Sequence, residues 1–344
     1  MIKPRRLRKG DKIATVSLSD GNAGGKMHHR YQLGKKRLEK LYNVEVVEMP
    51  NSQKGSEYIY KHPEARAEDL MKAFEDKSIN AIITNTGGED TLRTMEYVNY
   101  NIIKDNPKIF MGYSDATVNH FMCYKAGLVS FYGPDIFALA EPGKLPNYMK
   151  EEIYDSIFNI NNKKEIKQSK VWTSDKFNKL KAESFENTRK MNTEKYGYEI
   201  LQGTGKVTGK LIGGCLEVLE MIKATELWPN LEEWNNKILF FETSEDSPNP
   251  YWLTCWLRNY AAIGVFDRIN GIIIGKPNNE KYYNEYKKIY LQVIREEVGR
   301  DDLPILYNMN FGHTFPMCIL PYGIEAEINC EYKKIVLVES GIIH

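Results

Sequence analysis

Short apolar runs alternate with amphipathic stretches through the first half of the chain, and this alternation constrains the fold more than any other feature. The strand candidates are KIATVSL, VEVVEM, INAIIT and KIFMGY, while residues 65–76 and 115–127 have the spacing of helices. Apolar strands separated by helices predict a parallel sheet that helices cover on both faces. We therefore expect an α/β fold that begins with a doubly wound parallel sheet.

A second set of apolar strands follows a polar segment, so two domains are expected. Residues 161–200 are lysine-rich and weakly periodic, which is typical of a linker or of a long functional loop. Strand candidates resume with KVTGKLIGG, KILFFET, INGIIIGK and LPILYNMNFG, and the tail predicts a β-hairpin. We expect an N-terminal domain over 1–160, a linker or substrate loop over 161–200, and a C-terminal α/β domain with its own sheet over 201–344.

Charge and cysteine usage narrow the class of protein further. With 47 basic and 46 acidic residues the formal net charge is +1, which gives no electrostatic reason to expect a nucleic-acid or membrane partner. The sequence has no apolar run near the roughly 20 residues of a membrane helix and no signal-peptide core. The five cysteines are widely spaced without a CxxC pair. We therefore expect a cytoplasmic protein with reduced thiols and no zinc site.

Residues 109–117, IFMGYSDAT, predict a strand that turns sharply into a helix, with Ser114 at the corner. A nucleophile on such a turn needs small residues two positions to either side, and Gly112 and Ala116 satisfy this demand. The free N–H groups of the helix favour an anion at the corner, so the N–H of Asp115 is a candidate oxyanion donor. Serine caps helices very often, however, and this short pattern alone favours the cap.

A second strand-to-helix turn, IITNTGGEDTLRTM, contains Gly87 and Gly88. Turns at the carboxyl ends of parallel strands share one edge of the sheet, where ligands bind. Two glycines let the backbone approach a substrate and present an N–H group that no side chain obstructs. The spacing matches neither a Walker nor a dinucleotide fingerprint, so contact with a substrate and plain turn chemistry remain the interpretations.

Two polar residues stand at the ends of apolar strands in the second half. His313 follows LPILYN in a glycine-containing loop, a position that suits proton transfer, although a lone loop histidine is more often simply exposed. Glu242 ends the strand of ILFFET, where a buried carboxylate needs a partner. This carboxylate either holds a histidine in its working tautomer or turns to water like the neighbouring Glu245 and Asp246.

Taken together, these segments resemble the LD-carboxypeptidase and microcin immunity protein family of serine peptidases. The resemblance runs from RLRKGDKIATVS through GGEDTLR, PKIFMGYSDAT and FYGPD to GKLIGGCLEVLE, FFETSED and NFGHTFPMCILPYG. Several motifs in the order of the family are far more specific than one motif alone. The resemblance implies an active site at the domain junction with a Ser–Glu–His triad, whose positions here are Ser114, Glu242 and His313.

The resemblance also implies the groups around the triad. The oxyanion hole would consist of the N–H groups of Asp115 and Gly88, with Gly87 beside the substrate. These implications reverse the preference for a helix cap at Ser114. The family further implies a homodimer that needs neither a metal ion nor an organic cofactor.

Within the family, the chain resembles the microcin-immunity branch more than the murein tetrapeptide branch. The long segment with VWTSDKF, and FYGPD after the elbow helix, carry this resemblance. In that branch an aromatic side chain stacks on the base of a peptidyl-nucleotide toxin, and Trp172 is the candidate here. Trp172 is equally suited to anchor the long loop by packing. Cys215 in GGCLE replaces a more usual asparagine, which affects a hydrogen bond to the substrate and not the triad.

Three functions are compatible with these features. The first is serine-based hydrolysis of the amide or acyl linkage in a peptidyl- or aminoacyl-nucleotide of the microcin C type, for self-protection. The second is an LD-carboxypeptidase that removes D-alanine from cytoplasmic murein tetrapeptide. The third is a small-molecule binding protein without turnover, which the presence of all three triad residue types disfavours. Whether residues 161–200 reach the pocket of Ser114 discriminates between the first two.

Overall fold

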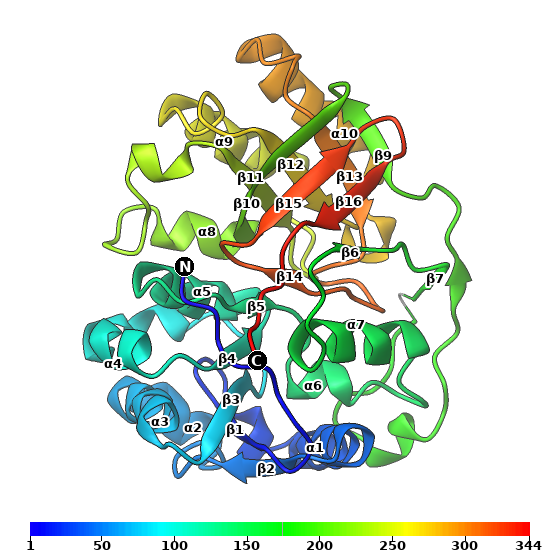
Figure 1. Ribbon diagram of the computed structural model, residues 1–344. Coiled ribbons are helices and arrows are strands. Elements are labelled where there is room, and N and C mark those ends of the chain that lie inside the picture. Colours follow the sequence, from blue (N-terminus) through cyan, green and yellow to red (C-terminus); the bar gives the residue numbers. More distant parts are fainter. Residues whose placement is uncertain (174) are drawn as a thin grey trace.

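The computed structural model describes residues 1–173 and 175–344, which form two halves that are each built on a β-sheet. Figure 1 shows the N-terminal half below and most of the C-terminal half above. This is the α/β arrangement with two sheets that the alternation of apolar runs and helices predicts. The expected domain boundaries after residues 160 and 200 stay predictions.

The first sheet has the strand order β14-β5-β4-β3-β1-β2, and its pairs are parallel except for the edge pair of β14 with β5. Its strands are β1 (Lys12–Val16), β2 (Glu45–Glu48), β3 (Ile79–Thr84), β4 (Ile109–Gly112), β5 (Phe131–Tyr132) and β14 (Leu320–Pro321). The accompanying α-helices are α1 (His28–Tyr42), α2 (Ser56–Lys61), α3 (Pro63–Glu75), α4 (Tyr100–Asp105), α5 (Thr117–Lys125), α6 (Ile136–Leu139) and α7 (Asn147–Ile157). Short 3-10 turns are η1 (Asn22–Gly24), η2 (Thr91–Tyr97) and η3 (Ser114–Ala116).

Alternate residues of the central strands face opposite layers of helices. In β3, Ile82 belongs to the core that includes residues of α3 and α5, whereas Ala81 and Ile83 belong to the core that includes residues of α1 and α7. Strands covered on both faces are mostly apolar, which explains the buried apolar residues 81–83 in INAIIT. Burial of each large side chain contributes about 1.5–3 kcal/mol. The sheet is therefore a rigid platform for the turns at its edge.

The second sheet has the strand order β6-β16-β15-β10-β11-β12-β13-β9, with a parallel centre from β10 to β13 and antiparallel pairs outside it. Its strands are β6 (Lys164–Glu165), β9 (Glu199–Gln202), β10 (Lys206–Cys215), β11 (Lys237–Glu242), β12 (Gly271–Gly275), β13 (Ile305–Met309), β15 (Glu325–Asn329) and β16 (Lys334–Leu337). The predicted hairpin of the tail is confirmed, because β15 pairs with β16.

The helices of the second half lie between these strands along the chain. They are α8 (Leu216–Ile222), η5 (Leu231–Trp234), α9 (Pro250–Ala262), η6 (Asn278–Glu280), α10 (Tyr283–Tyr290) and the π-helical turn η7 (Leu291–Glu297). In the part of the chain that the structure describes, no helix has the length and apolar composition required to span a bilayer.

The segment from 161 to 200 contains short elements of its own besides β6 and β9. Strand β7 (Val171–Trp172) pairs with β8 (Asn192–Thr193), and η4 (Ala182–Phe185) lies between them. The Thr173 N–H donates to the carbonyl of Phe315 at 3.0 Å. This hydrogen bond fixes the segment to the loop that carries His313.

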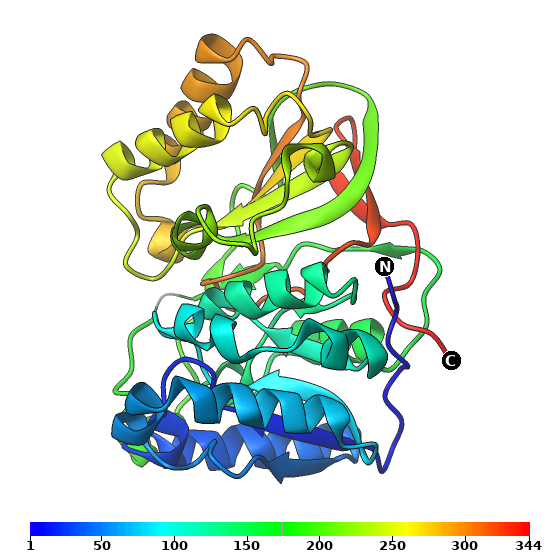
Figure 2. The ribbon, with the colours of Figure 1, turned by 90° about the vertical axis from the view of Figure 1, so that its left-hand side faces the viewer.

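The chain crosses between the two halves more than once. Strand β14, close to the C-terminus, extends the first sheet, and β6 pairs with β16 in the second. Figure 2 shows both termini on one side of the molecule, where Arg5 forms a bridge with Ile343. As a result, residues that follow β4 and β13 come into contact at the junction.

Candidate active site

Ser114 lies on a tight turn between β4 and the following helix. Its φ of 60° is left-handed, a conformation that costs free energy outside glycine and is found at nucleophile turns. The turn is crowded, because a Cβ added to Gly112 would lie 2.9 Å from the Cβ of Ala116. The Oγ of Ser114 is directed to His313 rather than to the N–H groups of α5. The turn therefore presents the hydroxyl at the edge of the sheet.

A chain of hydrogen bonds connects Ser114, His313 and Glu242. The Oγ of Ser114 lies 3.1 Å from Nε2 of His313, and Nδ1 of His313 lies 2.7 Å from Oε2 of Glu242. The backbone N–H of His313 donates to the same carboxylate oxygen at 3.1 Å. The side chains of Glu242 and His313 are only 1% and 7% exposed, so water screens their interaction little. The fold thus brings together three residues that the sequence places in both halves.

Tyr132, the last residue of β5, connects Ser114 and Glu242, the two ends of this chain of hydrogen bonds. Its hydroxyl accepts the backbone N–H of Ser114 at 3.0 Å and donates to Oε1 of Glu242 at 2.5 Å. Burial, and then the charge of Glu242, raises the pKa of Tyr132 well above its usual value, so the phenol keeps the proton that it donates. Tyr132 was not among the site residues predicted from the sequence. The available signal was its position in FYGPD, at the carboxyl end of the strand next to β4.

The carboxylate of Asp115 fixes the glycine turn beside the serine. This side chain is buried and accepts hydrogen bonds from Oγ of Ser19 at 2.5 Å and from the N–H groups of Asp90 and Thr91 at 3.0 and 2.8 Å. Arg66, which is also fully buried, pairs with Asp90 at 3.1 Å. The position of the turn is therefore set by charge-assisted hydrogen bonds, which are stronger than neutral ones.

Both glycines of this turn line the same cavity as Ser114. A Cβ on Gly87 would lie 3.0 Å from the Oγ of Ser114 and 3.6 Å from the backbone nitrogen of Asp115. Gly88 has a φ of 147°, and a Cβ there would meet Oγ of Ser19. Only glycine leaves this space open beside the hydroxyl.

Two carboxylates control the charge of His313. Burial by itself lowers the pKa of His313, but the charge and hydrogen bond of Glu242, followed by those of Glu245, raise this pKa well above its usual value. Oε2 of Glu245 lies 3.0 Å from Nε2 of His313, and this hydrogen bond is the main reason that the pKa of Glu245 falls to about 2. Glu245 was expected to turn to water. Its side chain is 58% exposed, but its carboxylate also contacts the imidazole.

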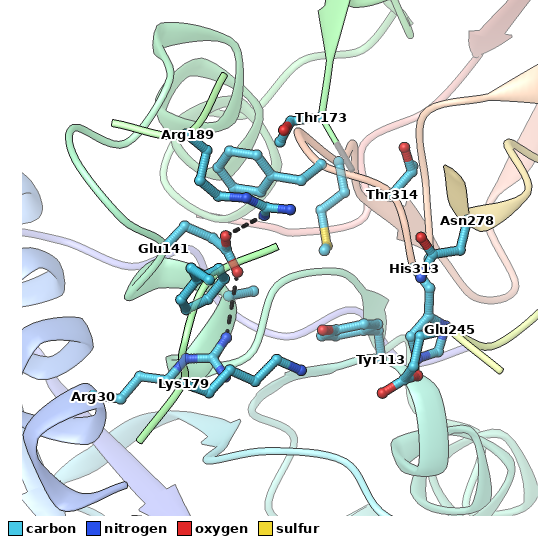
Figure 3. Close-up of a pocket in the computed structure, with 15 residues that line it drawn as sticks. Arg30, Tyr113, Glu141, Thr173, Lys179, Arg189, Glu245, Asn278, His313 and Thr314 are labelled. Carbon is cyan, nitrogen blue, oxygen red and sulfur yellow. Dashed lines mark hydrogen bonds and ion pairs between the residues drawn. The ribbon is translucent and has the colours of Figure 1, made fainter. Parts of the chain in front are cut away.

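A cavity of about 240 Å³ opens over the hydroxyl of Ser114, and a second one of about 140 Å³ adjoins it. The residues that line both are Arg30, Tyr113, Lys179, Glu245 and His313. In Figure 3, Glu141 pairs with Arg30 at 3.3 Å and with Arg189 at 2.5 Å. The ammonium of Lys179 points into the space between Glu141 and Tyr113. Among the described residues Lys179 has no ion-pair partner, so its charge is available to a ligand.

The segment from 161 to 200 reaches these cavities through four side chains, those of Thr173, Phe177, Lys179 and Arg189. Trp172 is not among them. It is 8% exposed, and the Nζ of Lys276 lies 4.5 Å from the centre of its ring. This contact is a cation–π interaction. Trp172 thus packs as an anchor of the segment, and the segment's aromatic ring at the cavity is that of Phe177.

Cys215 ends β10 directly beside Glu242 on β11. Its thiol is buried and donates to Oε2 of Glu217 at 3.4 Å. The Sγ atom also lies within 4.8 Å of ligand atoms of Glu242 and His313. Burial, and then the charge of Glu242, raises the pKa of Cys215 well above its usual value. Cys215 is therefore a neutral thiol packed beside the carboxylate of Glu242.

Two family models match the chain. They are the LD-carboxypeptidase N-terminal domain over residues 13–133 and the LD-carboxypeptidase C-terminal domain over residues 208–328. The microcin C7 self-immunity protein MccF of Escherichia coli is 30% identical over 80% of this chain and 78% of its own. The probable murein peptide carboxypeptidase of Bacillus subtilis is 25% identical over 99% of this chain and 95% of its own.

A solved structure shows the same relationship in three dimensions. The MccF-like protein from Streptococcus pneumoniae, in complex with AMP, has a TM-score of 0.86 and 34% sequence identity, and the match covers 95% of this chain and 98% of that one. The family models include the segments with Ser114, Glu242 and His313. This chain belongs to the LD-carboxypeptidase family, whose two-domain fold and serine-peptidase class of hydrolysis it shares.

Proposed function

We propose that Ser114 is the nucleophile, His313 the general base and Glu242 the group that orients His313. The hydrogen-bond chain of 3.1 and 2.7 Å between these three side chains carries the proposal. Oγ of Ser114 attacks the carbonyl carbon while its proton moves to Nε2 of His313. The bond to the leaving nitrogen then breaks, and the same proton passes to that nitrogen. Water repeats the sequence on the acyl-enzyme and returns Ser114 to its hydroxyl form.

The N–H groups of Asp115 and Gly88 are proposed to stabilise the oxyanion. Two observations support this assignment. A Cβ added to Gly87 would lie 3.0 Å from Oγ of Ser114 and 3.6 Å from the Asp115 nitrogen, so the glycine turn borders both groups, and the Asp115 carboxylate holds the residues that follow the two glycines. Donors that are already positioned need no reorganisation as the negative charge develops, which is the basis of their catalytic effect.

The proposed substrate is an aminoacyl- or peptidyl-nucleotide of the microcin C type, and the reaction would serve detoxification in the cytoplasm. Lys179 and Phe177 of the 161–200 segment line the cavities. Because this segment reaches the pocket of Ser114, the nucleotide function is favoured over the murein function. A cation and an aromatic ring suit a phosphate-like group and a base. The pneumococcal relative was solved with AMP, and the relative from Escherichia coli is a microcin immunity protein. A homodimer, as the family resemblance implies, belongs to the same proposal.

The alternative function is removal of D-alanine from murein tetrapeptide, which the relative from Bacillus subtilis supports by its description. The test is incubation of the protein with murein tetrapeptide and with aspartyl sulfamoyl adenosine, followed by mass spectrometry of the products. We expect release of sulfamoyl adenosine. Release of D-alanine alone would establish the alternative. Binding of either compound without any product would point to a protein that has lost turnover.

Recognition of the base is proposed to depend on Phe177 rather than on Trp172. Stacking on an aromatic ring contributes about 1–3 kcal/mol per base, so Phe177→Ala is expected to weaken binding of an aminoacyl sulfamoyl adenosine roughly 5- to 150-fold. Phe177→Tyr keeps the ring and is the matched control. Trp172→Ala is expected to weaken nucleotide and peptide ligands alike, because it loosens the whole segment. Calorimetric titration of the variants measures both effects, and a selective loss of the nucleotide in Trp172→Ala would restore Trp172 as the stacking residue.

A further inference from the structure

Nε2 of His313 has two partners that require different protonation states. Oγ of Ser114 lies 3.1 Å from this nitrogen, and Oε2 of Glu245 lies 3.0 Å from it. A base for Ser114 needs a free lone pair on Nε2, because it must accept the proton of the hydroxyl. A carboxylate oxygen at hydrogen-bond distance needs an N–H group on the same atom. The two hydrogen bonds to Nε2 therefore cannot form at the same time.

The surroundings of His313 favour the protonated ring while no substrate is bound. Among the described residues, five titratable groups lie around it: Glu242 at the end of β11, Glu245 in the next loop, Cys215 with Sγ within 4.8 Å of a ring nitrogen, Tyr113 with a ring centre 5.2 Å away, and Asp135 at the start of α6. The two glutamates outweigh burial and raise the pKa of His313. Burial, the first cause, raises the pKa of Asp135 to about 7, so Asp135 adds less negative charge than an ordinary aspartate at neutral pH.

Glu245 is free to change its partner, unlike Glu242. The side chain of Glu245 is 58% exposed, whereas that of Glu242 is 1% exposed and held by Tyr132 and His313. Glu245 lines both cavities, beside the space over Ser114. It can therefore turn from the ring to a ligand without disturbing packed side chains. Since its pKa is lowered to about 2, it carries a negative charge throughout the working range of pH.

We propose that Glu245 recognises an ammonium group on the α-carbon of the substrate's acyl part. In this exchange Glu245 leaves the ring of His313 for the ammonium, which frees His313 to act as the base. The inference rests on the proposed function, because it assumes acyl transfer to Ser114. The α-nitrogen is one carbon away from the scissile carbonyl. Oγ of Ser114 and Oε2 of Glu245 flank the same ring nitrogen, so an acyl group held at Ser114 places its ammonium within reach of Glu245.

The proton balance of the exchange is simple. The incoming ammonium takes the place of the imidazolium N–H on Glu245, and its positive charge disfavours a second positive charge on the ring. Nε2 releases its proton to solvent, and the neutral ring then accepts the proton of Ser114. Substrates that carry the ammonium thus activate the base that cleaves them. Glu245 would make the enzyme specific for free aminoacyl compounds over those without an amino group.

The test compares aspartyl sulfamoyl adenosine with its desamino counterpart, succinyl sulfamoyl adenosine, in the wild type and in Glu245→Gln. The wild type is expected to prefer the amine about 10- to 100-fold in kcat/KM, the range of a hydrogen bond between charged groups. Glu245→Gln is expected to reduce this preference to within about threefold of unity. Asp246→Asn removes the same charge one residue further along the loop and serves as the control that keeps the preference.

The pH profile gives a second measure that a merely structural role would not change. Loss of the carboxylate lowers the pKa of His313, so the acid limb of kcat/KM on the desamino compound moves to lower pH in Glu245→Gln. An unchanged limb together with an unchanged preference for the amine would overturn the inference. A changed preference with an unchanged limb would also overturn it, because the contact with His313 would then have no effect.

Failure of the proposed function can be told apart from failure of this inference. If the wild type cleaves neither nucleotide compound, the proposed function fails, and binding to Ser114→Ala protein decides the role of Glu245. Calorimetry in buffers of different ionisation enthalpy is expected to show tighter binding of the amine and release of a proton, both lost when Glu245→Gln is added. Equal binding of the two compounds to the Ser114→Ala protein would overturn the inference.

Discussion

Ser114→Ala is expected to reduce hydrolysis by roughly 10⁴-fold or more while the protein stays folded. The substitution removes the hydroxyl oxygen that lies 3.1 Å from Nε2 of His313. The backbone N–H that donates to Tyr132 remains, and alanine has no bulkier Cβ than serine at the left-handed turn. Product formation from the accepted substrate measures the loss, and circular dichroism with thermal unfolding measures the fold.

The matched control for this variant is Ser130→Ala. Ser130 is a fully buried serine whose Oγ bonds to Nδ1 of His120 at 2.8 Å and not to the residues around the cavity. Its loss is expected to cost about 1 kcal/mol of stability and to leave turnover within a few-fold of the wild type. A Ser114→Ala protein that kept more than a tenth of the wild-type rate would show that the nucleophile lies elsewhere.

Glu242→Gln is expected to have the second largest effect, a loss of roughly 10³- to 10⁴-fold in kcat. The two oxygens of Glu242 accept three hydrogen bonds: Nδ1–H and the backbone N–H of His313 on Oε2, and the hydroxyl of Tyr132 on Oε1. An amide has one acceptor oxygen, so at least one of these donors would face an NH₂ group. The ring of His313 would lose its orientation or its tautomer, and the charge that stabilises the imidazolium would be absent.

Single-turnover kinetics on the accepted substrate measure this loss, and thermal unfolding reports any damage to the fold. Glu217→Gln is the matched control, because Glu217 is a mostly buried neighbour whose carboxylate accepts the N–H of Ser244 at 2.8 Å. It is expected to keep turnover within a few-fold. If Glu242→Gln retained a tenth of the activity, the role assigned to the carboxylate would be wrong, although Ser114 could still be the nucleophile.

Much of the fold could be predicted from the sequence, because the relevant signals are local. A strand buried on both faces needs consecutive apolar residues, such as 81–83 in INAIIT, and β3 forms there. Alternating polarity in the tail predicts a hairpin, and β15 and β16 form it. The two-residue strands β5 and β14 could not be predicted, because two residues carry no periodicity. Their pairing depends on a neighbouring strand that is already in place.

The candidate site likewise combines features that the sequence predicts with contacts that it does not. The sequence by itself determined the turn at Ser114, since small residues at 112 and 116 and a strand before a helix are features of adjacent residues. It also placed Glu242 at the end of a strand and His313 in the loop that follows one. Only the tertiary structure decided that Tyr132 joins Ser114 to Glu242 and that Glu245 shares Nε2 of His313. The physical reason is that these contacts join side chains far apart in the chain, and the packing of two sheets, rather than any local pattern, sets the distances between them.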